Sequence, residues 1–308
     1  MTTPATIQIK QTRKEAPVRL LIHGPGGVGK STFAAAAPHT VFSAAEDGLS
    51  NIDAHALPEA KSWGDLLAQL DYLATEPHTF KTYALDSLDW AEPMCWAAVC
   101  EKGDAKGKRM PNIEAFGYGK GYVAALDEWR MFLSKLETIR RKGMAIILIA
   151  HSVRKTVKNP QGDDYEQWQI KLHEKAAGLL KEWVDVVGFA EHEVLTFEND
   201  NGRVKGIASG KRMLKTAPAA GYDGKTRFAM PASMPLDWSM FATAVREGGA
   251  GALNRLRGEF AAKLAELAEP EVEAKARAFV ASRGETVASL TEAIATVVNY
   301  ISERKAAS

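Results

Sequence analysis

The segment GPGGVGKS, from Gly24 to Ser31, carries the clearest chemical signal in the chain. It satisfies the G-x-x-x-x-G-K-[ST] pattern of a phosphate-binding loop, follows the apolar run VRLLIH and opens a stretch typical of a helix. Glycines let backbone N–H groups converge on a phosphate, and the start of a helix adds partial positive charge. A purely structural glycine-rich turn is the alternative, which the context disfavours. The segment therefore predicts a nucleotide site.

The pattern also assigns roles to single residues. Lys30 is expected to reach the β- and γ-phosphates and to take part in catalysis, and the Ser31 hydroxyl is expected to bind Mg²⁺. Thr32 follows at the position that contacts the α-phosphate in such loops. The predicted cofactors are therefore ATP and Mg²⁺. The predicted nucleotide-binding residues are Gly24, Pro25, Gly26, Gly27, Val28, Gly29, Lys30, Ser31 and Thr32.

Polar residues end three further apolar runs. Asp86 ends KTYALD and is the predicted acid of the magnesium shell, acting through water, with Asp89 a weaker candidate. Glu46 follows TVFSAA and could orient or deprotonate an attacking water. His151 ends GMAIILIAH and could hydrogen-bond the γ-phosphate and report its loss. The alternatives are a solvated loop carboxylate for Glu46 and a structural histidine for His151.

Strand-like and helix-like stretches alternate through the first two-thirds of the chain, which predicts an α/β fold with a mostly parallel sheet flanked by helices. The expected strands are residues 18–23, 40–44, 81–86 and 143–150. The expected helices are residues 30–37, 62–77, 90–99 and 122–141. The chemically interesting residues thus stand at strand ends.

Composition excludes several classes of protein. The 308 residues are 46% hydrophobic, which excludes disordered and fibrous chains, and the net charge of +1 means that nucleic acid could be bound only by local basic patches. Two cysteines cannot build a disulfide framework or a four-ligand zinc site. No apolar run is long enough for a membrane helix or a signal peptide, so we expect a soluble cytoplasmic protein without a membrane partner.

Three regions are expected: an N-terminal extension (1–16), a core (17–245) and a helical C-terminal module (246–308). Asn201-Gly202 predicts a hairpin turn. GGAG, residues 248–251, reads as a linker, and Ser289 as the N-cap of the last helix. The alternating ATIQIKQ near the start could form a strand with a neighbouring subunit.

The order of these parts resembles the RecA-type recombinase core. It is especially similar to the phage-encoded RecA-like P-loop ATPases of the Sak-type single-strand annealing group. The matching features are the P-loop, VFSAAEDGL, YALDSL, ILIAH, FGYGKGY and the closing KTRFAMPASMPLDW. The resemblance covers about residues 18–241 and implies a RecA-like P-loop NTPase core with a small helical C-terminal module.

The resemblance implies that Glu46 is the catalytic base and Asp86 the acid that holds magnesium through water. The switch position is often glutamine in the RecA family, whereas here it is His151. The family also places two cations, two residues apart, on the γ-phosphate of a neighbouring subunit, and Lys225 and Arg227 have that spacing. A solvated basic strand is the alternative for this pair.

Recombinase cores bind single strands through two loops, which correspond here to residues 100–122 and 152–168. The predicted DNA-binding cations are Lys106, Lys108, Arg109, Arg154, Lys155 and Lys158. Tyr118, Tyr122, Tyr165 or Trp168 could stack on bases. A third basic stretch, residues 203–227, has seven cations and one acid. Solvated surface charge is the alternative for these clusters.

These observations lead to one hypothesis: a DNA-stimulated ATPase that binds single-stranded DNA, supports annealing or strand exchange, and hydrolyses ATP between subunits of a ring or filament. A single-strand-binding protein or another replication or recombination factor is a further expected partner. The expected location is the cytoplasm of a phage-infected or lysogenic bacterial cell. The alternatives are a hexameric helicase or helicase loader and, with less support, a small-molecule kinase.

Overall fold

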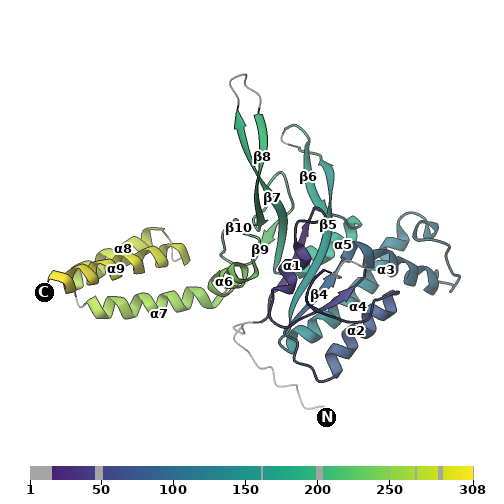
Figure 1. Cartoon of the computed structure of the whole chain (residues 1–308), viewed down its shortest axis with the longest axis horizontal. Coiled ribbons are helices and arrows are strands. Elements are labelled where there is room, and N and C mark those ends of the chain that lie inside the picture. The colour runs from purple at the N-terminus through teal and green to yellow at the C-terminus, as the bar shows by residue number, and fades with distance from the viewer. Residues whose placement is uncertain are drawn as a thin grey trace, which may run out of the picture. The chain divides into compact units, whose positions relative to one another are not determined.

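The computed structural model describes residues 16–45, 51–160, 162–198, 204–248, 250–267, 269–283 and 287–307. Contacts divide the chain near residue 246: Ala16–Val245 form one compact unit, and the helices of the C-terminal segment belong to another. Figure 1 shows the strands gathered in the first unit, with three long helices in the second. We describe each unit by itself.

The first unit is built on one mixed sheet in the order β10-β8-β7-β1-β5-β4-β2-β3. The central strands β7, β1, β5, β4 and β2 run parallel, whereas β8 and β10 at one end are antiparallel additions. The strands are β1 (Arg19–Gly24), β2 (Thr40–Ala44), β3 (His55–Ala56), β4 (Thr82–Asp86), β5 (Ala145–Val157), β6 (Tyr165–Ile170), β7 (Val186–Glu198), β8 (Val204–Lys215), β9 (Lys225–Thr226) and β10 (Ser233–Pro235).

Helices cover both faces of this sheet. Successive residues of β1 alternate between two hydrophobic clusters: Leu21 belongs to the cluster with α2, α3, α4 and α5, and Leu20 and Ile22 to the cluster with α1 and α6. Burial on both faces explains why the parallel strands are continuously apolar. The helices are α1 (Lys30–Ala35), α2 (Trp63–Thr75), α3 (Leu88–Lys102), the short 3-10 helix η1 (Ile113–Phe116), α4 (Lys120–Arg141), α5 (Glu174–Trp183) and α6 (Trp238–Gly248).

Two strands continue past the end of β1. Gly24, the last residue of β1, lies beside His151 of β5, yet β5 runs on to Val157 and pairs there with β6. On the other side, β7 pairs with β1 up to Phe189 and then continues to Glu198 with β8 as its partner. Two antiparallel arms, β5–β6 and β7–β8, therefore extend beyond the edge of the sheet where β1 ends (Figure 1).

The first of these arms corrects a sequence expectation. Residues 152–168 were predicted as a loop, but Ser152–Val157 pair with Tyr165–Ile170 in a regular antiparallel register. The physical reason is that alternating polar residues can form a strand when each backbone group finds a partner, even without a buried face. The predicted hairpin formed by β7 and β8 is present, while its Asn201-Gly202 turn lies outside the described residues.

The second unit consists of α7 (Ala250–Leu267), α8 (Pro270–Arg283) and α9 (Val287–Ala307), with a hydrophobic cluster of its own around Phe260, Leu264 and Leu290. Two sequence expectations are wrong here. α7 begins at Ala250, so most of GGAG is helical, and Ser289 lies buried inside α9 instead of at its N-cap. Apolar packing decides both points.

The α/β class, with a mostly parallel sheet, a RecA-like P-loop core and a helical C-terminal module, is confirmed. Among the described residues, no helix combines the length and apolar character needed to cross a membrane. The strand β5 separates the P-loop strand β1 from β4, the strand that ends in Asp86. This order decides which side chains meet at the P-loop.

Candidate nucleotide-binding site

The loop from Gly24 to Ser31 joins β1 directly to α1, as the motif predicts. Gly27 and Gly29 have φ angles of 74° and 99°, a region that glycine enters without strain. Gly24 is required for a different reason: a Cβ atom there would lie 2.3 Å from the carbonyl oxygen of Ala190 in β7. The loop is thus shaped by its own turns and by the adjacent strand.

Lys30 is buried and its ammonium bends back over the loop. Its Nζ donates hydrogen bonds to the carbonyl oxygens of Gly24, at 3.1 Å, and Pro25, at 2.9 Å. A buried ammonium is stable only when its donors are satisfied, and phosphate oxygens are stronger acceptors than these neutral carbonyls. The geometry therefore suits an ammonium that passes from the loop to a bound phosphate.

The predicted magnesium residues do meet. The Ser31 hydroxyl donates a hydrogen bond to Asp86 Oδ2 at 2.5 Å, although the two residues are 55 positions apart. Asp86 ends β4 and is almost fully buried. Burial raises the pKa of the Asp86 carboxyl, and the Ser31 hydrogen bond and the Lys30 charge oppose that rise.

A hydroxyl and one carboxylate fit the way proteins hold Mg²⁺ beside a nucleotide. Mg²⁺ prefers oxygen ligands and keeps several waters, so one or two protein oxygens together with phosphates complete its shell. No cluster of three or more His, Cys, Asp or Glu side chains suited to a metal occurs among the described residues. The Ser31–Asp86 pair is therefore where Mg²⁺ would be held in this part of the chain.

His151 lies next to the loop, as predicted, because its backbone pairs with Gly24. Its Nδ1 bonds to Asp89 Oδ2 at 3.0 Å, and its backbone N–H donates to Asp89 Oδ1 at 2.9 Å. Burial alone would raise the pKa of Asp89, but the hydrogen bonds from His151 outweigh it and bring the value to about 2. Asp89 is thus an ionised acid that orients His151.

The other predicted catalytic residues are placed differently. Glu46 lies outside the described residues; Ala45, just before it, donates its backbone N–H to the Asp86 carbonyl at 2.8 Å. Lys225 and Arg227 lie toward the opposite end of the strands, since Lys225 pairs with Val187, two residues before Phe189, the partner of His23.

Lys225 and Arg227 bind the end of α5. Lys225 Nζ donates to the carbonyl oxygens of Lys181, at 2.5 Å, and Val184, at 3.0 Å. Arg227 donates to the carbonyl of Glu182 and pairs with Asp185. Burial lowers the pKa of Lys225, and the Arg227 charge adds to the effect. These cations cannot serve the nucleotide of their own chain, and their action on a neighbouring subunit stays a prediction.

Sequence reasoning missed two neighbours of the loop. Ala190 packs its carbonyl against Gly24, and Arg212 of β8 places its guanidinium against Gly29. No sequence signal marks Ala190, because any residue has a carbonyl. Arg212 was visible only as one cation of a basic stretch.

The predicted DNA-binding cations fall into two groups. Arg109 pairs with Glu101, Lys158 pairs with Asp164 at 2.5 Å, and Arg154 lies over the Trp168 ring, 5.1 Å from its centroid. By contrast, the described residues offer no ion-pair partner to Lys106 or Lys108. The backbone N–H groups of these two lysines donate to Asp104 Oδ1, which shapes a turn that presents both side chains.

The four candidate stacking aromatics also differ. Tyr118 stands between Gly117 and Gly119, all three with positive φ, and its side chain is fully exposed. Tyr122 stacks on His173 at 3.8 Å between ring centroids, and Trp168 stacks on Phe189 at 6.3 Å. Of the four, Tyr118 is the ring that is open to a base.

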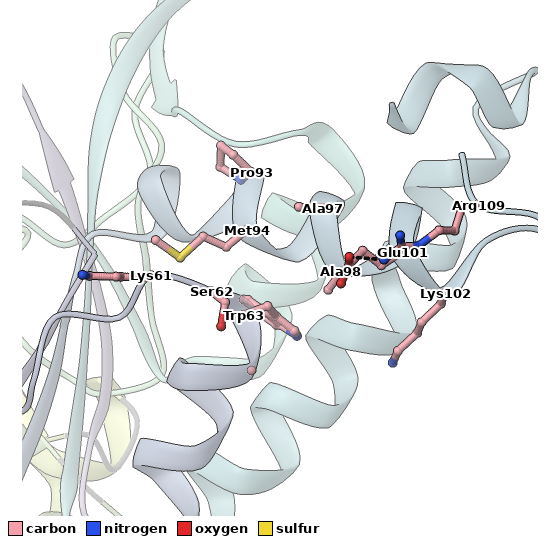
Figure 2. Close-up of a pocket in the computed structure, with 11 residues that line it drawn as sticks. Lys61, Ser62, Trp63, Pro93, Met94, Ala97, Ala98, Glu101, Lys102 and Arg109 are labelled. Carbon is pink, nitrogen blue, oxygen red and sulfur yellow. Dashed lines mark hydrogen bonds and ion pairs between the residues drawn. The ribbon is translucent and has the colours of Figure 1, made fainter. Parts of the chain in front are cut away.

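A groove elsewhere on the first unit takes no part in the P-loop. It lies between the start of α2 and one face of α3, where Trp63 and Ser62 lie opposite Met94, Ala97 and Ala98 (Figure 2). Arg109 and Glu101 form their ion pair at its side. Arg109 is therefore committed to this wall.

The fold and the site define a P-loop ATPase: a nucleotide loop, a magnesium-type serine and acid, and a polar residue on the strand between them. The chain belongs to the AAA_24 family, described as an AAA domain, whose model matches residues 16–228.

Solved structures provide two further comparisons. The crystal structure of the RadB recombinase is similar at 13% identity, over 65% of this chain and 80% of that one, with a TM-score of 0.38. The crystal structure of flagellar accessory protein FlaH from Methanocaldococcus jannaschii is similar at 12% identity, over 69% and 83%, with a TM-score of 0.33. No curated protein matches the chain.

Proposed function

We propose that this chain is an ATP-dependent single-stranded-DNA-binding recombination protein of the phage Sak-type group, which hydrolyses ATP between subunits and supports annealing or strand exchange. The observation that carries the ATPase part is the 2.5 Å contact between Ser31 and Asp86 at the end of the P-loop. It joins two motifs distant in sequence into one site of the composition that Mg²⁺ and a triphosphate require.

In this mechanism the loop binds the phosphates and Lys30 exchanges its carbonyl partners for phosphate oxygens. Ser31 and Asp86 would hold Mg²⁺, Asp86 through water; when bound, the ion neutralises phosphate charge. Glu46 accepts a proton from the attacking water. Each of these roles concerns charge at the phosphates, which is where phosphoryl transfer is catalysed.

The His151–Asp89 pair gives the site a route to the rest of the molecule. His151 lies on β5, which continues without interruption into the β5–β6 arm. The Nδ1 bond to Asp89 orients the ring, so a change of contact at its other side is transmitted to the strand. We propose that His151 reports the state of the γ-phosphate to that arm.

Single-stranded DNA is the proposed polymer ligand because unpaired cations and an exposed aromatic ring belong to neighbouring segments. Lys106 and Lys108 would contact phosphates, and Tyr118 would stack on a base without reading sequence. Lys155, also without an ion pair among the described residues, would add a contact from the β5–β6 arm. Arg109, Arg154 and Lys158 would contribute less, since each already has a partner.

The experiment that tests the proposal is ATP turnover with and without single-stranded DNA across a salt series. We expect DNA to stimulate turnover at low salt and the stimulation to fall steeply as salt rises. Lys30→Ala should abolish turnover, and intact activity in that variant would contradict the P-loop assignment. No stimulation at any salt concentration would contradict the DNA part, and unwinding of a tailed duplex would favour a helicase.

A further inference from the structure

Arg212 of β8 lies against the P-loop of its own chain. A Cβ atom built on Gly29 would stand 2.3 Å from Arg212 Nη1 and 3.3 Å from Cζ. The guanidinium therefore fills the space beside Gly29, the residue that directly precedes Lys30. It reaches this place from a strand that is distant from the loop in sequence.

The backbone fixes this position within the chain. Arg212 pairs with His192 of β7, and its carbonyl accepts a hydrogen bond from the Leu236 N–H at 2.9 Å. Ala190, two residues before His192, packs its carbonyl against Gly24. The same two strands thus contact both ends of the glycine-rich segment, and Arg212 is held there by the sheet itself.

The charge of Arg212 has no counterpart in the described part of the chain. No ion pair or hydrogen bond engages its guanidinium there, and its side chain is exposed. The acid on the facing strand, Glu191, pairs instead with Lys215 at 3.4 Å. An arginine placed beside a buried lysine raises the electrostatic free energy unless an anion lies between them.

We propose that Arg212 binds the α- and β-phosphates of the nucleotide held by the P-loop of the same chain. The inference rests on the proposed function, since it requires that this loop binds a nucleotide. The backbone of such a loop surrounds the α- and β-phosphates, while its lysine reaches the β- and γ-phosphates. A guanidinium beside Gly29 therefore meets the part that ATP and ADP share, and its planar fork suits two phosphate oxygens.

Nucleotide affinity of single variants tests the proposal, measured with fluorescent ATP and ADP analogues on the full chain. Arg212→Ala should weaken both by about 10-fold to 100-fold, the range for loss of hydrogen bonds to a charged group. Arg212→Lys should recover part of the loss. Lys211→Ala, the matched control, removes a neighbouring exposed cation of β8 and should leave both affinities unchanged. Thermal unfolding without nucleotide checks that each variant is folded.

The possible failures are distinguishable. If Arg212→Ala binds ADP as tightly as the unaltered chain, the proposal is overturned. An equal loss in Lys211→Ala would also overturn it, because the effect would then come from general surface charge. If the unaltered chain binds neither nucleotide, the proposed function fails together with this inference.

Discussion

At the residue scale, glycines of one loop serve different physical purposes, and this allows a matched comparison. Gly24→Ala would force a Cβ atom to within 2.3 Å of a backbone oxygen, whereas at Gly26 a Cβ would meet nothing within 4 Å. We expect Gly24→Ala to lower the free energy of unfolding by about 1–3 kcal/mol, the usual effect of overpacking, and to weaken nucleotide binding. Urea unfolding measures the difference.

Gly26→Ala is the control for the loss of a glycine from this loop. Its free energy of unfolding should stay within about 0.5 kcal/mol of the unaltered chain, as for most unstrained surface changes. Equal destabilisation by the two substitutions would mean that the close approach of β7 to Gly24 is not what requires glycine there.

A second residue-scale prediction concerns Glu92 of α3, a buried carboxyl that accepts the backbone N–H of His173 at 3.0 Å. Burial raises its pKa to about 7, and the Asp89 charge adds to the rise, against the hydrogen bond from His173. Between the unfolded pKa of 4.5 and about 7, the folded chain keeps a proton that the unfolded chain has lost. Stability contributed by this group is therefore present at low pH and falls as pH rises through that window.

Replacing Glu92 with glutamine removes this titration. Between pH 5 and pH 8 the unaltered chain should lose up to roughly 3 kcal/mol of unfolding free energy relative to Glu92→Gln. Urea unfolding at the two pH values measures the difference, and Glu76→Gln, at an exposed position after α2, controls for removal of one acidic side chain. Parallel pH curves for the unaltered chain and Glu92→Gln would show that Glu92 is not protonated in the folded state.

At the element scale, the turn after α3 and the β5–β6 arm make separate contributions to DNA binding. Lys106→Ala with Lys108→Ala should weaken single-strand binding and reduce the slope of log K against log salt by about 1.4, near 0.7 for each phosphate that is no longer neutralised. Lys158→Ala, which removes a cation already paired with Asp164, should change the slope far less. Fluorescence anisotropy with an oligonucleotide over a salt series measures all three.

An unchanged slope in the double variant would exclude the turn as a phosphate-binding element. A larger change in Lys158→Ala than in the double variant would assign the phosphates to the arm. The two elements are far enough apart in sequence that their contributions can be separated cleanly.

At the scale of the whole molecule, the position of Lys225 and Arg227 bears on assembly. They lie away from their own P-loop, so any role at a γ-phosphate must be exerted on a neighbour. A chain with Lys225→Ala and Arg227→Ala, mixed with Glu46→Gln chains, should regain measurable ATP turnover, because each type of subunit supplies what the other lacks. Turnover of the mixture is compared with that of each variant alone.

The pair also stabilises the end of α5, so thermal unfolding of the double alanine variant must be measured beside turnover. A folded double variant that shows no recovery on mixing would assign Lys225 and Arg227 to α5 alone. Light scattering on the same samples reports whether mixed oligomers form.

The sequence by itself determined the local features of this protein. The Gly24–Ser31 loop follows from its motif, and the central strands follow from runs of apolar residues that only a sheet covered on both faces can bury. Asp86 and His151 were predicted because polar residues at the carboxyl ends of parallel strands meet at one edge of the sheet.

Only the tertiary structure decided what depends on long-range pairing. The continuation of β5 past His151, the burial of Ser289 in α9 and the ion pairs of Arg109 and Lys158 each depend on partners that local sequence does not specify. Arg212 is the clearest case, since one cation among the seven of residues 203–227 reaches Gly29 only because β8 pairs with β7 and β7 with β1. Strand order, not composition, brings that charge to the loop.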